Sequence, residues 1–133
     1  MKLLALDYGT KRIGLALGDT ADQAVVPYGF IENKGDFFVL GELKKICDEE
    51  DVDVIVIGVP EHKELKGVKE IIKKFIAYLK ENINIEIDTA DEKFTSKIAS
   101  QDARYEDLYK DRSKGWKDAR AAEEILRGYL EKF

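Results

Sequence analysis

The sequence predicts an α/β fold, in which a five-stranded mixed sheet has helices on both of its faces. Two apolar runs at the start of the chain are separated by the residues Gly9–Arg12, a connection too short for a crossover, so these two strands must pair antiparallel. Further along, Val52–Val59 is a β-branched apolar run, which is typical of a parallel strand buried on both faces. Segments with helical spacing of apolar residues precede and follow this run, as right-handed crossovers require.

The first three strands are expected to form an antiparallel meander. Lys2–Tyr8 and Ile13–Gly18 lie on either side of the turn, and Ala24–Ile31 follows as a third extended segment. Pro27 falls inside this third segment. Because proline cannot donate a ladder hydrogen bond, it favours a strand at the edge of the sheet.

Helices and strands then alternate along the chain. Apolar residues at helical spacing predict helices over Phe37–Glu50 and Glu61–Asn82, and period-two alternation predicts a fifth strand over Ile83–Ile87. Two further helices are predicted over Thr95–Tyr109 and Trp116–Lys132. The residues expected on the inner faces of the first two helices are Phe37, Leu40, Leu43 and Ile46 or Cys47, and then Val68, Ile71, Ile72, Phe75 and Leu79.

This order of elements predicts the strand order 3-2-1-4-5, with the first strand in the centre beside the fourth. Residues 1–133 are expected to form one domain, since this length suffices for a full hydrophobic core. In open α/β sheets, functional sites usually lie at the carboxyl ends of the parallel strands. The candidate site is therefore expected at that edge.

Composition excludes several classes of protein. A single Cys, Cys47, rules out an intramolecular disulfide, and together with the single His, His62, it rules out a structural zinc site; both residues are expected to be structural or incidental. No apolar stretch approaches the length of a membrane span and no N-terminal signal is recognisable, so a cytoplasmic protein without membrane contact is expected. The formal net charge of −5 allows nucleic-acid binding only through a local basic patch.

One acid lies inside the first apolar run, LALDYGT. An ionised carboxylate at such a position is costly unless something compensates its charge. Asp7 could accept hydrogen bonds from the following turn, pair with a cation or bind a metal ion.

Further acids are expected at the same edge of the sheet. Asp91 and Glu92 follow the fifth predicted strand, and Asp118 opens the last helix. Asp118 continues that helix's buried stripe, which consists of Ala122, Ile125 and Tyr129, whereas Glu123, Glu124 and Arg127 are expected to point outward. Each acid could also serve only the helix dipole or a cap. Convergence of three carboxylates would instead suit Mg²⁺ or Mn²⁺.

Four short segments carry a resemblance to a known family. They are LALDYGTKRIGLAL near the start, VIGVP in the middle, DEKFTS after the fifth predicted strand and KDARAAEEILRGYL near the end. Over nearly its whole length the chain resembles the YqgF/RuvX family of RNase H-like nucleases, which are related in fold to Holliday-junction resolvases of the RuvC type. The resemblance implies an RNase H-like fold and an endonuclease that hydrolyses phosphodiester bonds in structured nucleic acid, with a role in 5′ maturation of precursor 16S ribosomal RNA.

The resemblance also implies the residues of the site. Asp7 matches the family's first-strand Asp, Glu92 matches the Glu of its Asp-Glu-Arg motif, and Asp118 matches the Asp on its last helix. All three are expected to be catalytic and to bind Mg²⁺ or Mn²⁺. The sequence departs from the family at Lys93, which replaces Arg and cannot hold a phosphate through two parallel bonds, at Ser96, which replaces Thr, and in the segment EHKELKG after Pro60.

A basic cluster around the last loop is the expected contact with nucleic acid, although it could also be a solvated loop. Trp116 within it could stack on a base or pack at the start of the last helix. The residues expected to bind nucleic acid are Lys11, Arg12, Lys93, Lys110, Arg112, Lys114, Lys117 and Arg120.

Other functions stay open from the sequence. The partner is expected to be structured RNA, in ribosomal precursor particles, or branched DNA, as for a Holliday junction resolvase. A non-catalytic RNA-binding assembly factor could keep the same fold. A sugar-kinase or actin-like ATPase shares DYGT in the first strand, but such proteins need two domains of this kind, and 133 residues supply one. The sequence does not fix the oligomeric state.

Overall fold

The computed structural model describes residues 1–60, 66–92 and 116–133, apart from the side chains of Lys66, Glu92 and Trp116. The helix predicted over Thr95–Tyr109 therefore lies outside the described residues. Within these ranges the elements are β1 (Lys2–Asp7), β2 (Arg12–Asp19), β3 (Val25–Glu32), α1 (Asp36–Glu50), β4 (Val54–Pro60), α2 (Lys66–Asn82), β5 (Glu86–Glu92) and α5 (Trp116–Leu130).

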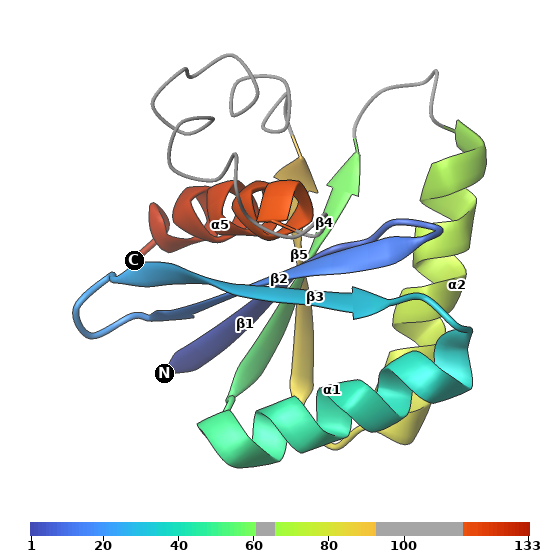
Figure 1. Ribbon diagram of the computed structural model, residues 1–133. Helices are drawn as coiled ribbons and strands as arrows, with labels where there is room; N and C mark the ends of the chain where they lie inside the picture. The colour runs from blue at the N-terminus through green and yellow to red at the C-terminus, as the bar shows by residue number, and fades with distance from the viewer. Residues whose placement is uncertain (61–65, 93–115) are drawn as a thin grey trace.

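The five strands form one mixed sheet in the order β3-β2-β1-β4-β5, which confirms the predicted topology (Figure 1). β1 pairs antiparallel with β2 and parallel with β4, and β4 pairs parallel with β5. β3 is an edge strand and contains Pro27, as predicted, opposite an irregularity of the ladder between Leu15 and Ala16. The short β1–β2 turn and the longer crossovers thus determine the order of the strands.

Helices cover both faces of the sheet, and each face has its own hydrophobic cluster. α1 and α2 lie on one face and α5 on the other (Figure 1). Along β1, Leu4 and Leu6 pack toward α1 and α2, whereas Leu3 and Ala5 pack toward α5. This alternation is the period-two geometry of a strand with both faces buried. The helical residues that complete the cluster on the α1 and α2 side are Val39, Leu40, Leu43, Cys47, Ile72, Phe75, Ile76 and Leu79.

The fifth strand lies later in the chain than the sequence predicts. The alternation predicts Ile83–Ile87, but β5 spans Glu86–Glu92 and is paired with β4 from Val54 to Pro60. Polar side chains are tolerated here because β5 is an edge strand. Ile83 and Ile85 precede the strand and still pack against the hydrophobic cluster, which explains why their alternation is misleading.

Several residues expected on inner helix faces are exposed. Phe37 is 84% exposed, Val68 37% and Ile71 43%. The buried stripe of α2 consists of Ile72, Phe75, Ile76 and Leu79, at positions i, i+3, i+4 and i+7, which leaves Ile71 at its border. Phe37 and Val68 each fall in the first turn of their helix. Conversely, helical periodicity predicts that Glu123 points outward, yet it is only 3% exposed and pairs with Arg127 at 3.2 Å.

None of the helices in the described part of the chain is long and apolar enough to span a lipid bilayer.

Candidate functional site

Asp7 is the last residue of β1 and lies half-buried at the carboxyl end of the parallel strands. Since Leu3 and Ala5 face α5, strand alternation places Asp7 on that same face. Its partner across the antiparallel ladder is Gly14 of β2. Side chains directly opposite each other in such a pair share one face of the sheet.

The helix α5 lies directly on the backbone of β2. A Cβ atom added to Gly14 would collide with the backbone carbonyl of Asp118, and one added to Gly18 would lie 2.8 Å from the Leu126 side chain. The absence of side chains at these two positions therefore allows the close approach. Because Gly14 is also the partner of Asp7, the first turn of α5 brings Asp118 to the end of β1. Two of the three predicted acids thus share one face and one end of the sheet.

Asp118 is held by a specific ion pair. The Nε–H of Arg12, at the start of β2, donates to Oδ2 of Asp118 with a distance of 2.9 Å between the two atoms. The Arg12 side chain is 34% exposed and that of Asp118 28%, so water only partly screens this charge-assisted hydrogen bond. Asp118 also lies in the first turn of α5, where the helix dipole favours a negative charge.

The β1–β2 turn is braced by Asn33, a residue that the sequence alone does not single out. The Asn33 side chain donates to the carbonyl of Gly9 at 2.9 Å, and its backbone N–H donates to the carbonyl of Lys11 at 2.8 Å. Asn33 also accepts a bond from the backbone N–H of Gly35 at 3.2 Å. The connection between β3 and α1 thereby fixes the turn that precedes Arg12. An asparagine after a strand is a common turn signal, but its long-range partners are visible only in the fold.

The second acidic pair lies at the end of β5. Asp91 pairs with Val59 and Glu92 with Pro60 in the register with β4, so both residues belong to the carboxyl edge, as predicted. Asp91 is exposed and lines a hollow of about 290 Å³ between β5 and α5. Among the described side chains, no group of three or more His, Cys, Asp or Glu residues could hold a metal ion. The Glu92 side chain lies outside this set, so the three-carboxylate site stays a prediction.

The predicted nucleic-acid-binding residues differ in their surroundings. Lys11 and Lys117 are exposed and adjoin the Arg12–Asp118 pair in the sequence. Arg120, by contrast, is only 4% exposed, and burial argues against a direct contact of its guanidinium with a phosphate. The remaining predicted contacts, which lie outside the described residues, are Lys93, Lys110, Arg112 and Lys114.

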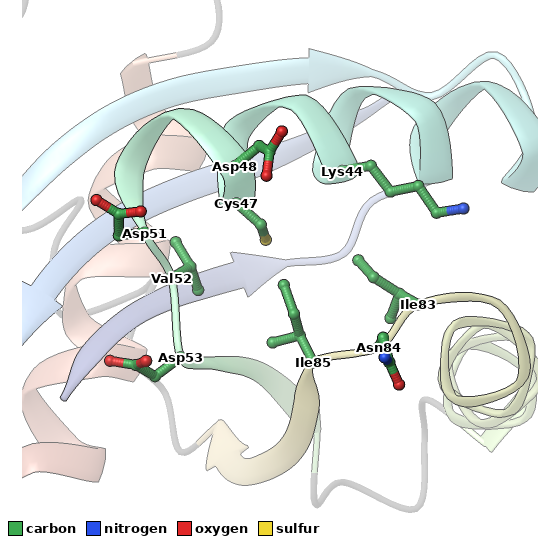
Figure 2. Close-up of a pocket in the computed structure, with 9 residues that line it drawn as sticks. All are labelled: Lys44, Cys47, Asp48, Asp51, Val52, Asp53, Ile83, Asn84 and Ile85. Atoms are coloured by element: carbon green, nitrogen blue, oxygen red, sulfur yellow. The ribbon is translucent and has the colours of Figure 1, made fainter.

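A separate pocket of about 560 Å³ lies at the opposite end of the sheet, before the amino ends of β4 and β5 (Figure 2). Cys47 lines it, and burial raises the pKa of its thiol to about 11. The thiol is therefore protonated at neutral pH and is a poor nucleophile. Of the acids there, Asp53 accepts a bond from the Lys2 backbone N–H at 2.8 Å, and Asp51 forms the left-handed C-cap of α1. These contacts give Asp53 and Asp51 structural roles. Cys47 belongs to the hydrophobic cluster on the α1 and α2 side of the sheet.

Tyr129 ties the far end of α5 to β5. Its hydroxyl donates to Oδ2 of Asp88 at 2.7 Å, and the residue is 6% exposed. Burial, together with the hydrogen bond to Asp88, raises the pKa of Tyr129 to about 12. The helix that carries Asp118 is thus anchored on β2 at its start and on β5 near its end.

Comparison with known proteins identifies the family of the chain. The RuvX family, described as Holliday junction resolvase, matches residues 1–132. The chain belongs to the RuvX family. A relative from Clostridium botulinum strain Hall is 36% identical over 98% of this chain and 97% of its own length. A relative from Clostridium kluyveri strain ATCC 8527 is 37% identical, with coverage of 99% and 98%. Both relatives carry the name "Putative pre-16S rRNA nuclease".

Solved structures of resolvases have the same fold. Thermus thermophilus RuvC in complex with Holliday junction substrate gives a TM-score of 0.58 at 10% identity, covering 99% of this chain and 94% of that one. The fowlpox virus Holliday junction resolvase gives 0.57 at 14% identity, covering 99% of both chains. The predicted RNase H-like fold is therefore confirmed. The predicted enzyme class, a hydrolytic nuclease, is confirmed at the level of the family.

The contact between Gly14 and Asp118 gives a first prediction. Gly14→Ala should lower the free energy of unfolding by about 1–3 kcal/mol, because the added methyl group must push the first turn of α5 off the sheet. Urea unfolding measures this change. Gly41→Ala is the matched control, since a Cβ atom there meets nothing within 4 Å; in the exposed face of α1 it should raise stability by up to about 1 kcal/mol. Equal stability of Gly14→Ala and the wild type would contradict the close approach.

The raised pKa of Tyr129 gives a second prediction. As pH rises from about 10 to about 12, the free energy of unfolding should fall, because the unfolded tyrosine ionises while the folded one stays protonated. Tyr129→Phe should remove part of this pH dependence in urea unfolding series above about pH 9. Tyr28→Phe should remove a further part, since burial, together with the charge of Glu50, also raises the pKa of Tyr28. An unchanged alkaline slope in Tyr129→Phe would exclude the stated role of this hydroxyl.

Proposed function

We propose that this chain is a divalent-metal-dependent endonuclease that cleaves phosphodiester bonds in structured nucleic acid, and that its task is 5′ maturation of precursor 16S rRNA in the cytoplasm. The observation that carries the proposal is the contact of the Asp118 backbone with Gly14, the sheet partner of Asp7. This contact places two acids from distant parts of the chain on one face at the carboxyl edge of the sheet, which supports a shared ion. The names of the Clostridium relatives support the choice of substrate.

The donor set suits a hard divalent cation. Asp7 and Asp118 offer carboxylate oxygens, which Mg²⁺ and Mn²⁺ prefer over nitrogen or sulfur. Arg12 offsets charge at Asp118, and a cation between the two acids would remove their mutual repulsion. We assign the ion to Asp7, Asp118 and Glu92. When bound, one or two such ions supply an activated water molecule and stabilise the leaving oxygen of the phosphodiester.

The protein's own residues bind and orient the substrate. Lys11 and Lys117 are exposed and adjoin Arg12 and Asp118 in the sequence, so they can contact phosphates next to the scissile one. Such contacts position nucleic acid without reading its sequence. We assign the two lysines this role and leave Arg120, which is buried, out of it.

A second substrate, branched DNA, is favoured by the description of the family as Holliday junction resolvase. It is also favoured by the RNase H-like resolvases whose structures contain Holliday junction DNA. Both substrates present the same phosphodiester to the same acids, so a decisive assay must offer both.

The wild-type protein should cleave precursor 16S rRNA in the presence of Mn²⁺, and Asp7→Asn and Asp118→Asn should each reduce the rate at least ~100-fold. This magnitude is expected because even outer-shell partners of a metal site contribute roughly 10–100-fold. The assay measures cleavage of the RNA and of a four-way DNA junction side by side, with and without chelator. Circular dichroism checks that Asp7→Asn keeps the fold.

Asp48→Asn is the matched control, because it makes the same change at an exposed acid in the pocket at the opposite end of the sheet. It should cleave at the wild-type rate. Full activity of Asp7→Asn would exclude the metal mechanism. Cleavage of the junction but not of the RNA would assign the second substrate. Tight RNA binding by a wild-type protein that cleaves neither substrate would indicate a non-catalytic assembly factor.

The assignment of the two lysines gives a further prediction. The double variant Lys11→Gln/Lys117→Gln should bind duplex nucleic acid more weakly, and the slope of log K against log salt concentration should become shallower by about 0.9 for each phosphate that the lysines no longer neutralise. Fluorescence anisotropy at several salt concentrations measures the slope. The double variant Lys44→Gln/Lys45→Gln carries the same change in charge on exposed positions of α1 and should keep the wild-type slope. Identical slopes in all three proteins would remove Lys11 and Lys117 from the binding surface.

A further inference from the structure

The guanidinium of Arg12 holds one specific atom of Asp118. The 2.9 Å contact joins Nε of Arg12 to Oδ2 of Asp118. A carboxylate has two oxygens and about four lone-pair sites, and this ion pair uses Oδ2 alone. Oδ1 takes no part in this pair, so Asp118 can bind another ligand through Oδ1 while the pair is intact.

Other contacts hold the backbone of both residues of this pair in place. Arg12 opens β2 and pairs with Glu32 in β3, and the preceding carbonyl, that of Lys11, accepts the bond from Asn33. The backbone of Asp118 is in contact with Gly14. Because the backbone of both residues is fixed, the two side chains have few rotamers in which the ion pair can form. Such a restriction of rotamers gives a functional site its precise geometry.

The contact could have two opposite consequences for an ion. If the arginine occupied the place of the ion, it would compete with the ion for Asp118, and its removal would tighten metal binding. If it orients the carboxylate, its removal would weaken metal binding, as happens when outer-shell partners of metal ligands are removed. Arg12 engages one oxygen only, it comes from the strand on which α5 packs, and both side chains of the pair are half-buried. These features favour a role in orienting the Asp118 carboxylate.

We propose that Arg12 is a positioning residue of the metal site, which holds Asp118 through Oδ2 so that Oδ1 is presented to the divalent ion. This inference rests on the proposed function and deepens it. It also changes the role of Arg12, for which the sequence predicts a contact with nucleic acid.

The test is the affinity for Mn²⁺ in the absence of nucleic acid, measured by titration calorimetry and by the electron paramagnetic resonance signal of free Mn²⁺. Arg12→Gln should weaken Mn²⁺ binding by about tenfold. Lys11→Gln is the matched control, because it removes the same unit charge from the adjacent, exposed residue and should leave the affinity equal or slightly higher. Arg12→Lys keeps the charge and should recover part of the affinity. Circular dichroism confirms the fold of each variant.

The outcomes separate this inference from the proposed function. Mn²⁺ binding by Arg12→Gln that equals or exceeds that of Lys11→Gln would overturn the positioning role and leave the nuclease proposal standing. Should Arg12→Gln not fold, a folded Arg12→Lys with full wild-type affinity would overturn the role as well, since lysine has no Nε–H to offer. A wild-type protein that binds no Mn²⁺, or an Asp118→Asn variant that binds it normally, would overturn both the role of Arg12 and the proposed metal site.

Discussion

The close approach of α5 to β2 is the constraint on which the candidate site depends. Helix and strand can touch there because Gly14 and Gly18 present no side chain to the helix. Any larger residue at Gly14 would displace the backbone of Asp118, and with it the carboxylate that pairs with Arg12. The same glycine pairs with Asp7 in the sheet. Gly14 therefore both permits the close packing of α5 and lies between the strand position of Asp7 and the backbone of Asp118.

Because of this close approach, the two faces of the sheet are packed differently. The face toward α1 and α2 is filled with large side chains such as Leu6, Ile57 and Phe75, which give the sheet a thick apolar layer. The face toward α5 contains Ala5 and Ala16 beside the glycines, so the helix axis can come nearer. Packing of large residues supplies stability on one face, and small residues on the other let polar groups of a helix reach the strand ends.

The strand order can be predicted from the sequence alone, because it follows from turn lengths and apolar runs, which are local properties of the chain. The sequence is misleading for β5, where pairing with β4, a tertiary contact, extends a strand through polar residues. It also misplaces Glu123, since helical periodicity assigns a face but does not show which neighbours cover it. Membership of a basic cluster likewise does not reveal that Arg120 is buried. The placement of Asp7 and Asp118 on one face and at one end of the sheet agrees with the sequence, whereas their role as metal ligands stays a prediction. Their supports, Asn33 and the specific atom that Arg12 holds, depend on contacts between residues distant in sequence.

Net charge is a poor guide to the partner of such a protein. The chain has a formal charge of −5, but the exposed Lys11 and Lys117 adjoin Arg12 and Asp118 in the sequence. Local cations of this kind, rather than the net charge, determine whether a polyanion can approach. If the acids form the proposed metal site, they repel a phosphate until a cation is bound. For the proposed nuclease, ion and nucleic acid must therefore bind with positive coupling, and linkage requires each to raise the affinity of the other by the same factor.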